Sequence, residues 1–198
     1  KAFASGVPAG DLLVTSAVYD DPQDGPTVLH FAVSLKAEGV NLRETWRAMG
    51  MRGTGSHDVE LNEVFVADAA ISGKRPQGKW HPLFHAISLL AFPLIYSAYM
   101  GVADGARAKA LEIARKKPSD EAGAYLAGEL ENAHTSAALA YEHMLALAET
   151  QPPGPDATSK QMIARTLVGR HAIETCERAL VAAGGGAYYR HAGLERAF

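Results

Sequence analysis

The sequence predicts an α+β protein built as two units, an antiparallel β-barrel or sandwich followed by an antiparallel helix bundle. Before residue 66 the apolar residues form short runs or alternate with polar ones, the pattern of half-buried strands. After residue 83 they recur every three or four positions over long stretches, the pattern of amphipathic helices. Between the two patterns lies TWRAMGMRGTGSHDVELNEVFV (residues 45–66), in which glycine turns lead into a last alternating run.

Four strands are expected in the first unit. Residues 11–19 and 27–36 are rich in Val, Leu, Phe and Thr, and the turn-forming DDPQDGP between them predicts a hairpin. Residues 40–46 and 59–66 supply two more strands. Strands that follow one another with short connections favour an antiparallel sheet.

A linker is expected at residues 71–82. This segment, ISGKRPQGKWHP, holds three Lys or Arg residues, two glycines and two prolines. We therefore expect a β-domain at 1–76 and a helical domain at 77–198. Because the chain opens in a strand-like run and closes without a helix stop signal, we expect it to be part of a longer polypeptide, with both domains truncated.

Three long helices are expected in the second unit, at residues 83–117, 121–150 and 158–183. Pro93 should bend or interrupt the first, because proline removes a hydrogen-bond donor and clashes with the preceding turn. Ser119 or Asp120 should cap the second helix. Its predicted buried stripe comprises Leu126, Leu130, Ala133, Ala137, Ala140, Met144 and Ala148.

The composition excludes several classes of protein. A net charge of -3 without a basic stripe argues against nucleic-acid binding. The one cysteine, Cys176, excludes an internal disulfide and is typical of a buried residue in a reducing, cytoplasmic compartment. The apolar run at 87–100 is too short, and too interrupted by Ser and Pro, to predict a membrane span.

Two groups of polar residues invite a catalytic or metal-binding interpretation. His81 and His85 lie four positions apart, but no third ligand follows, so no metal site is expected. The triplet Ser56-His57-Asp58 predicts a turn, because catalytic triads assemble from separate segments.

Two features near helix ends have a structural and a functional interpretation. Cations at Arg115, Lys116 and Lys117 complement the negative end of a helix dipole, and phosphate binding is the alternative. The glycines at 184–186 can end a helix. Three in a row exceed what one cap needs, so a close approach of the backbone to a ligand stays open.

Three segments together resemble the acyl-CoA dehydrogenase-like flavoproteins. The opening KAFASG resembles the strand beside the flavin ring, and residues 45–66 resemble the closing strands of the middle β-domain. ALVAAGGGAYYRHAGLERAF resembles the glycine turn at the adenine half of the cofactor, often bound by a neighbouring subunit. The resemblance implies a truncated middle β-domain, three helices of a C-terminal four-helix bundle, bound FAD and a homo-oligomer, either a dimer or a tetramer.

The resemblance also implies particular cofactor contacts. Phe3 and Ser5 would line the flavin ring, with the Ser5 hydroxyl or its neighbouring backbone at the N5–O4 edge. No catalytic residue is expected in this chain, because the position of the less common glutamate base holds Ala91 and the commoner position lies beyond residue 198. Toward the pyrophosphate and adenine, the implied contacts are Lys117, Gly184, Gly185 and Tyr188.

The favoured activity is α,β-dehydrogenation of an acyl-CoA thioester, by α-proton abstraction and hydride transfer to flavin N5, with an electron-transfer partner. The alternative is a reduced-flavin-dependent monooxygenase that uses FMN, an aromatic substrate and a separate flavin reductase. Phe92, Lys117 and Asp120 favour the alternative, because the family usually places arginine, arginine and phenylalanine there. A third possibility is a non-catalytic assembly domain.

Overall fold

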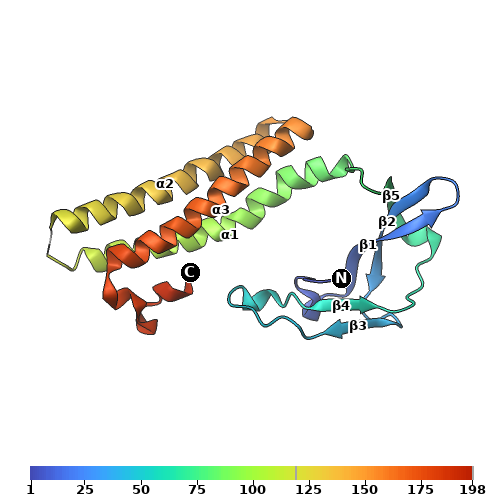
Figure 1. Cartoon of the computed structure of the whole chain (residues 1–198), viewed down its shortest axis with the longest axis horizontal. Helices are drawn as coiled ribbons and strands as arrows, with labels where there is room; N and C mark the ends of the chain where they lie inside the picture. The colour runs from blue at the N-terminus through green and yellow to red at the C-terminus, as the bar shows by residue number, and fades with distance from the viewer. Residues whose placement is uncertain (119, 198) are drawn as a thin grey trace. The chain divides into compact units, whose positions relative to one another are not determined.

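The computed structural model describes residues 1–118 and 120–197 and divides the chain into two compact units, Lys1–Trp80 and His81–Phe198 (Figure 1). The division falls after Trp80, slightly beyond the domain boundary that the sequence predicts after residue 76. Each unit has its own hydrophobic core.

The first unit contains two small antiparallel sheets. Strands β1 (Leu12–Asp21), β2 (Gly25–Ser34) and β5 (Ile71–Pro76) form one sheet in the order β1-β2-β5. Strands β3 (Val40–Arg43) and β4 (Asp58–Leu61) form the other. The antiparallel sheet architecture is therefore confirmed, although no closed barrel forms within the described residues.

Strand β5 shows that the linker prediction for residues 71–82 was wrong in its first half. Phe31 of β2 pairs with Ile71, and Thr27 pairs with Pro76. The glycine, lysine and proline content hid a short edge strand, in which proline is tolerated because one side of the strand donates no ladder hydrogen bonds.

The second sheet is shorter than the sequence suggests. Strand β3 ends at Arg43, where the chain turns through a hydrogen bond from Thr45 N to Arg43 O at 2.8 Å. Strand β4 ends at Leu61, and Glu63 has a left-handed φ of 52° that no strand contains. Across the pair, Arg43 donates to Glu60 at 2.7 Å and keeps the pKa of that carboxyl below its ordinary value.

The core of the first unit joins the sheets to the start of the chain. Ala4 and Val7, from the opening segment, are buried against strand residues of both sheets. The other buried members are Leu13, Phe31, Val33 and Val59. Because the opening segment contributes core residues, its backbone is held in place.

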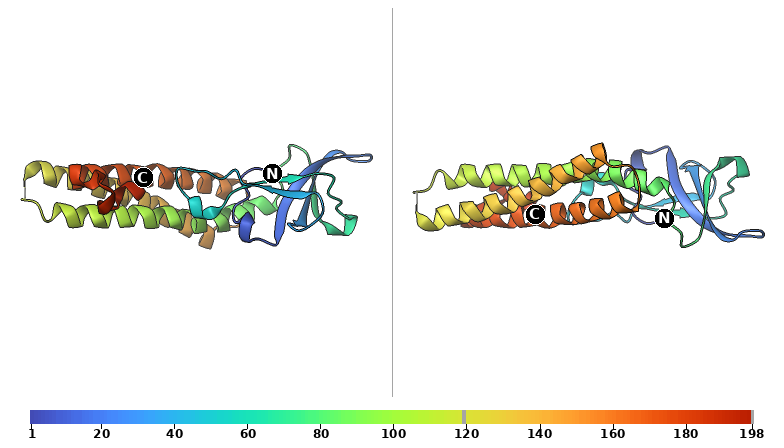
Figure 2. Two further views of the ribbon diagram at one scale, coloured as in Figure 1. Left: turned by 90° about the horizontal axis from the view of Figure 1, so that it is seen from below. Right: turned by 90° about the horizontal axis from the view of Figure 1, so that it is seen from above.

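The second unit is an antiparallel bundle of three helices, α1 (Leu83–Ala114), α2 (Glu121–Thr150) and α3 (Pro155–Ala183), as Figures 1 and 2 show. Helix α3 packs against both α1 and α2. The sequence predicts that Pro93 bends or interrupts the first helix. Helix α1 runs through Pro93 without interruption, so the second of these outcomes was wrong. Asp120 caps α2 by accepting from Gly123 N at 2.6 Å, whereas the alternative cap, Ser119, lies outside the described residues.

Small side chains dominate where the helices meet. Leu130 of α2 is fully buried among alanines of α1 and α3, and Cys176 lies in the same cluster. Burial, together with the nearby Glu177, raises the pKa of the Cys176 thiol, in agreement with a structural role. Because alanine adds little beyond the backbone, the helices can approach closely. The alanines of this seam are Ala106, Ala110, Ala179, Ala182 and Ala183, and Ala187 of the 3-10 turn after α3 joins the same cluster.

Among the described helices, α1 is long and apolar enough to cross a membrane by length and composition. About 28% of its most apolar window is buried in the bundle, so much of the apolar surface is open in the chain by itself. Exposed apolar side chains recur along one stripe, at Leu83, Ile87, Leu90 and Leu94. This stripe is an apolar face of α1 that the other helices of the bundle do not cover.

Candidate functional site

The opening segment and the glycine turn, both singled out by the sequence, lie side by side in the first unit. Ala4 N donates to His57 O at 2.9 Å, and Gly6 N donates to Thr54 O at 2.7 Å. Val59 N donates to Lys1 O at 2.8 Å. These bonds form an antiparallel pairing between residues more than 45 positions apart, which no local pattern could reveal.

The pairing presents Phe3 and Ser5 on the surface. Their neighbour Ala4 is 5% exposed, whereas Phe3 is 72% exposed and Ser5 is also open to solvent. Phe3 has a left-handed φ of 54°, a conformation that costs an L-residue about 1–2 kcal/mol. Its backbone nitrogen donates to Asp58 Oδ1 at 3.2 Å, and its ring meets Trp46 edge to face at 6.4 Å.

Behind Ser5 lies a row of hydroxyl groups that we call the hydroxyl chain, formed by Ser5, Ser56 and Thr54. Ser5 Oγ lies 2.9 Å from Ser56 Oγ, which lies 2.7 Å from Thr54 Oγ1. Thr54 Oγ1 donates to the Met51 carbonyl at 2.9 Å. Ser56, the middle member, is 5% exposed, whereas Ser5 is open to solvent and Thr54 is half-buried.

The triplet Ser56-His57-Asp58 anchors three different segments. His57 Nδ1 accepts from Trp46 N at 3.0 Å, Ser56 contacts Ser5, and Asp58 accepts from Phe3. The turn predicted for the triplet was wrong, because the 3-10 turn ends at Thr54, His57 pairs with Ala4 and Asp58 begins β4.

The other predicted site residues gather at one end of the helical unit. Lys117 Nζ donates to the Ala183 carbonyl at 2.6 Å and so caps the end of α3. Gly184 has a φ of +77°, and a Cβ there would lie 2.8 Å from Lys117 Nζ. Both residues therefore have a structural role that explains their identity.

Gly185 and Tyr188 have no such explanation. A Cβ at Gly185 would meet no atom within 4 Å, so local packing does not require glycine there. Tyr188, in the 3-10 turn Gly185–Tyr188, is 64% exposed. The cofactor contacts predicted for these two residues stay predictions.

The Lys117 cap can be tested directly. Lys117→Met removes the charged donor from the end of α3, and we expect the bundle to lose about 1 kcal/mol of unfolding free energy. Urea unfolding followed by helix circular dichroism measures the loss. Lys116→Met is the matched control, because the exposed Lys116 pairs only with Glu112 one turn earlier, and it should leave stability unchanged. Equal stability in both variants would contradict the cap.

Comparisons with known proteins match this architecture. No family model matches the chain. Putative acyl-CoA dehydrogenase YdbM of Bacillus subtilis (strain 168) is 27% identical over 212 residues, covering 99% of this chain and 52% of that protein. A dibenzothiophene monooxygenase of Mycolicibacterium goodii is 34% identical over 125 residues, covering 58% of this chain and 29% of that protein.

Solved structures agree over the whole chain. The complex of KijD3 with FMN and a dTDP-sugar superposes with a TM-score of 0.82 at 21% identity, covering 100% of this chain and 51% of that one. TdsC from Paenibacillus sp. A11-2, with FMN and indole, superposes with a TM-score of 0.80 at 20% identity. The match covers 100% of this chain and 57% of that one. The chain has the acyl-CoA dehydrogenase-like fold. It represents this fold in part, because it spans about half or less of the length of the curated relatives above.

Within this part of the acyl-CoA dehydrogenase-like fold, the two histidines near the start of α1 have hydrogen-bond partners. His81 Nδ1 accepts from Leu83 N at 3.1 Å, and His85 Nδ1 shares a hydrogen bond with Thr158 Oγ1 at 2.8 Å. Among the described residues, no group of three or more His, Cys, Asp or Glu side chains could hold a metal ion.

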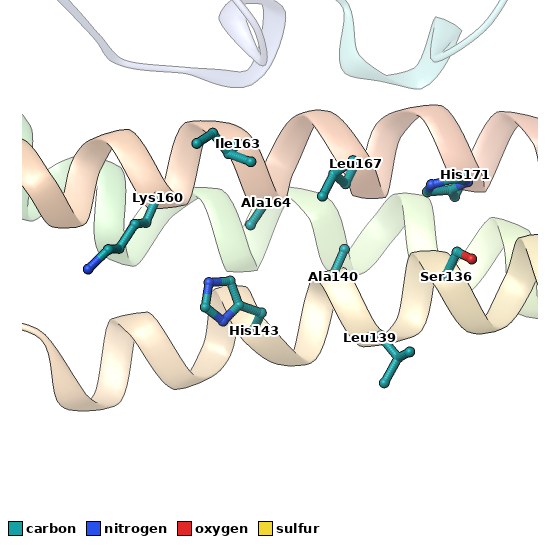
Figure 3. A pocket seen from close by; sticks show the side chains of 9 residues that line it. All are labelled: Ser136, Leu139, Ala140, His143, Lys160, Ile163, Ala164, Leu167 and His171. Atoms are coloured by element: carbon teal, nitrogen blue, oxygen red, sulfur yellow. The ribbon is translucent and has the colours of Figure 1, made fainter.

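A shallow groove of about 500 Å³ runs along the outside of the bundle between α2 and α3 (Figure 3). Two of its polar side chains have partners outside the groove lining, since Lys160 pairs with Asp156 at 2.7 Å and His171 with Glu174 at 3.1 Å. Most of the exposed lining is apolar, including Leu139, Ile163 and Leu167. This groove has the character of a packing surface, and the hydroxyl chain remains the best candidate functional site.

Proposed function

We propose that the full protein is a flavin-dependent monooxygenase that uses reduced FMN and acts on a small aromatic or heteroaromatic substrate. Several dibenzothiophene monooxygenases support the proposal, with 34–37% identity over 124 or 125 residues. KijD3 and TdsC, whose folds agree with this chain, were both solved with FMN. The dehydrogenase activity favoured by the sequence becomes the second candidate.

The observation that carries the proposal is that the side chains of Lys117 and Asp120 are both bound to helix ends. These residues stand where the resemblance places the contacts of the adenine half of FAD. Lys117 is bound to the Ala183 carbonyl, and Asp120 caps α2 by accepting from Gly123 N. With both side chains engaged in ending or starting helices, a flavin without an adenine half, FMN, is the better match.

The residues around the hydroxyl chain are suited to one edge of a planar flavin ring. Phe3 offers an exposed aromatic surface held by Trp46, and Ser5 offers an exposed hydroxyl oxygen. We therefore keep the proposed contacts of Phe3 with the ring and of Ser5 with its N5–O4 edge. The predicted contacts of Lys117, Gly184, Gly185 and Tyr188 would matter only if FAD were bound.

Reduced FMN, when bound, supplies two electrons with which one atom of O₂ enters the substrate and the other leaves as water. This chain's residues bind and orient. Phe3 would contact the flavin ring, Ser5 would form a hydrogen bond at its edge, and Trp46 would keep Phe3 in position. We assign no general acid or base to this chain.

The proposal includes partners and a location. A separate flavin reductase would supply reduced FMN in the cytoplasm, and a homo-oligomer would cover exposed apolar surface. The exposed stripe on α1, at Leu83, Ile87, Leu90 and Leu94, supports a further packing partner for the bundle.

Acyl-CoA dehydrogenation stays the second candidate because the match to YdbM covers 99% of the chain. The two activities are separated by supplying the full protein with chemically reduced FMN, O₂ and dibenzothiophene or indole. An oxygenated product supports the proposal. Anaerobic bleaching of oxidised flavin by acyl-CoA esters would instead support the dehydrogenase.

The Ser5 contact gives a test within this chain. Ser5→Ala removes the hydroxyl at the flavin edge, and we expect FMN to bind about 5–10-fold more weakly, the value of one hydrogen bond. Fluorescence titration of the full protein with FMN measures the change. Ser16→Ala, at an exposed position of β1, is the control and should bind FMN as wild type does. Unaltered FMN affinity in Ser5→Ala would contradict the proposed contact between Ser5 and the flavin.

A further inference from the structure

Arg165, on α3, holds its guanidinium close to two aromatic rings of α1. Its Cζ lies 5.0 Å from the centre of the Phe92 ring and 6.0 Å from the centre of the Tyr96 ring. Phe92 and Tyr96 lie one turn apart, so they share a face of α1. A guanidinium at such a distance is attracted by the electrons of an aromatic face. The two rings therefore fix the position of a positive charge at the seam between α1 and α3.

This charge has no anionic partner among residues 1–118 and 120–197. The hydrogen bond that Arg165 forms within them runs from Nη1 to Met162 Sδ at 3.6 Å, and a thioether sulfur is a weak acceptor. A guanidinium carries several N–H donors, arranged as a rigid fork. Most of the donors of Arg165 therefore bind no oxygen of the part of the chain that the structure describes.

The other two partly buried arginines of the bundle are paired with carboxylates. Arg107 donates twice to Glu131 Oε2, at 2.8 and 2.9 Å, and Arg178 lies 3.5 Å from Glu129 Oε2. Arg165 is partly buried to a similar degree, but only aromatic rings and a sulfur atom surround its charge. Removing a charge from water without an opposite charge costs free energy, so an anion that reached Arg165 would be stabilised there.

We propose that Arg165, positioned by Phe92 and Tyr96, binds an oxyanion of a small ligand, either a phosphate monoester or a carboxylate. The fork of N–H donors matches pairs of oxygens in both groups. Arg165 keeps part of its surface exposed, so a ligand can reach the guanidinium. The site is built by α1 and α3 alone, and it would serve a monooxygenase or a dehydrogenase equally.

Calorimetric titration of the full protein with inorganic phosphate, benzoate, FMN and riboflavin tests the site. Riboflavin is FMN without its phosphate, so the last two ligands isolate the phosphate monoester. Arg165→Met keeps a long, unbranched side chain against the rings but removes the charge and its donors. We expect this variant to bind the oxyanion about tenfold more weakly, the value of a charge-assisted hydrogen bond.

Arg170→Met is the matched control, because it removes the same charge from an exposed position of the same helix. It should bind all four ligands as wild type does. Arg165→Lys keeps the charge and loses the fork, so it should recover only part of the affinity. If Arg165→Met does not fold, Arg165→Lys supplies the same comparison.

The ligands separate the two sources of the oxyanion. In Arg165→Met, a loss of affinity for inorganic phosphate or FMN, with riboflavin unchanged, identifies a phosphate monoester. A loss confined to benzoate identifies a carboxylate.

Two results would overturn the oxyanion site. One is equal affinity of wild type and Arg165→Met for all four ligands, and the other is an equal loss for FMN and riboflavin alone. Arg165 would then serve only to join α1 and α3. Wild-type protein that binds inorganic phosphate or benzoate through Arg165, but neither FMN nor riboflavin, would support the site while contradicting the proposed function.

Discussion

Gly39→Ala should destabilise the first unit by about 3–5 kcal/mol. Gly39 has a φ of +84°, and an added Cβ would overlap the carbonyl oxygen of Asn62 and press on Val64. The oxygen cannot retreat freely, because Asn62 N is bonded to Gly39 O at 2.9 Å beside the β3–β4 pair. Amide hydrogen exchange in Val40–Arg43 and Asp58–Leu61 should accelerate by at least about 100-fold.

Gly25→Ala separates the clash from the backbone conformation. Gly25 has a similar φ of +70°, but a Cβ there would meet no atom within 4 Å. We expect Gly25→Ala to destabilise the first unit by about 1–2 kcal/mol, the cost of an L-residue in the left-handed region. Equal effects of the two substitutions would contradict the close approach at Gly39. Because β4 leads out of the glycine turn, the damage at Gly39 should also weaken FMN binding.

Leu130→Ala should cost the helical unit about 3–5 kcal/mol. Leu130 is completely buried between alanines, whose short side chains cannot move into the space left by the substitution. Cys176 lies in the same cluster and is the one cysteine of the chain. The rate at which a thiol reagent labels Cys176 therefore reports opening of this core, and it should rise at least about 100-fold.

Leu139→Ala is the control on the same helix. Leu139 lines the outer groove and is 61% exposed, so its removal creates no cavity. Labelling of Cys176 should stay near the wild-type rate. A similar acceleration in both variants would show that burial does not set the contribution of these leucines.

Helices were predicted well because their signals are local. The second predicted helix, 121–150, has the bounds of α2, and Asp120 caps it as expected from the residue type. The first helix was expected to reach residue 117 but ends at Ala114, before the basic run. Helix α3 begins at Pro155 rather than at residue 158, since proline is favoured in the first turn.

Strands and the site were predicted less completely, because their contacts join distant residues. Phe3 and Ser5 were proposed as flavin contacts from a motif and stay a prediction, and the contact between Ser5 and Ser56 spans 51 positions. Ser56 was singled out only within the Ser56-His57-Asp58 triplet, and Thr54 and Trp46 carried no separate signal beyond lying near the glycine turn. Strand β5 was missed because its edge position tolerates residues that usually mark loops.

At Phe92, Lys117 and Asp120 the sequence differs from the residues usual in the acyl-CoA dehydrogenase-like family, and these differences already pointed away from a typical dehydrogenase. The family resemblance nevertheless favoured dehydrogenation with FAD, whereas the relatives and the caps at Lys117 and Asp120 favour a monooxygenase with FMN. Motif resemblance is strongest for the scaffold and weakest for the reaction, since one fold carries both chemistries.

The alanine seam of the bundle limits how these helices can diverge during evolution. A larger residue at Ala110 or Ala179, both completely buried, would push two helices apart, and glycine would weaken each helix by about 1 kcal/mol. Mutation to a larger or to a smaller residue is therefore unfavourable at these positions. Proteins that share this bundle should vary instead at sites such as Met100 and Met144, where a flexible side chain leaves room for compensation.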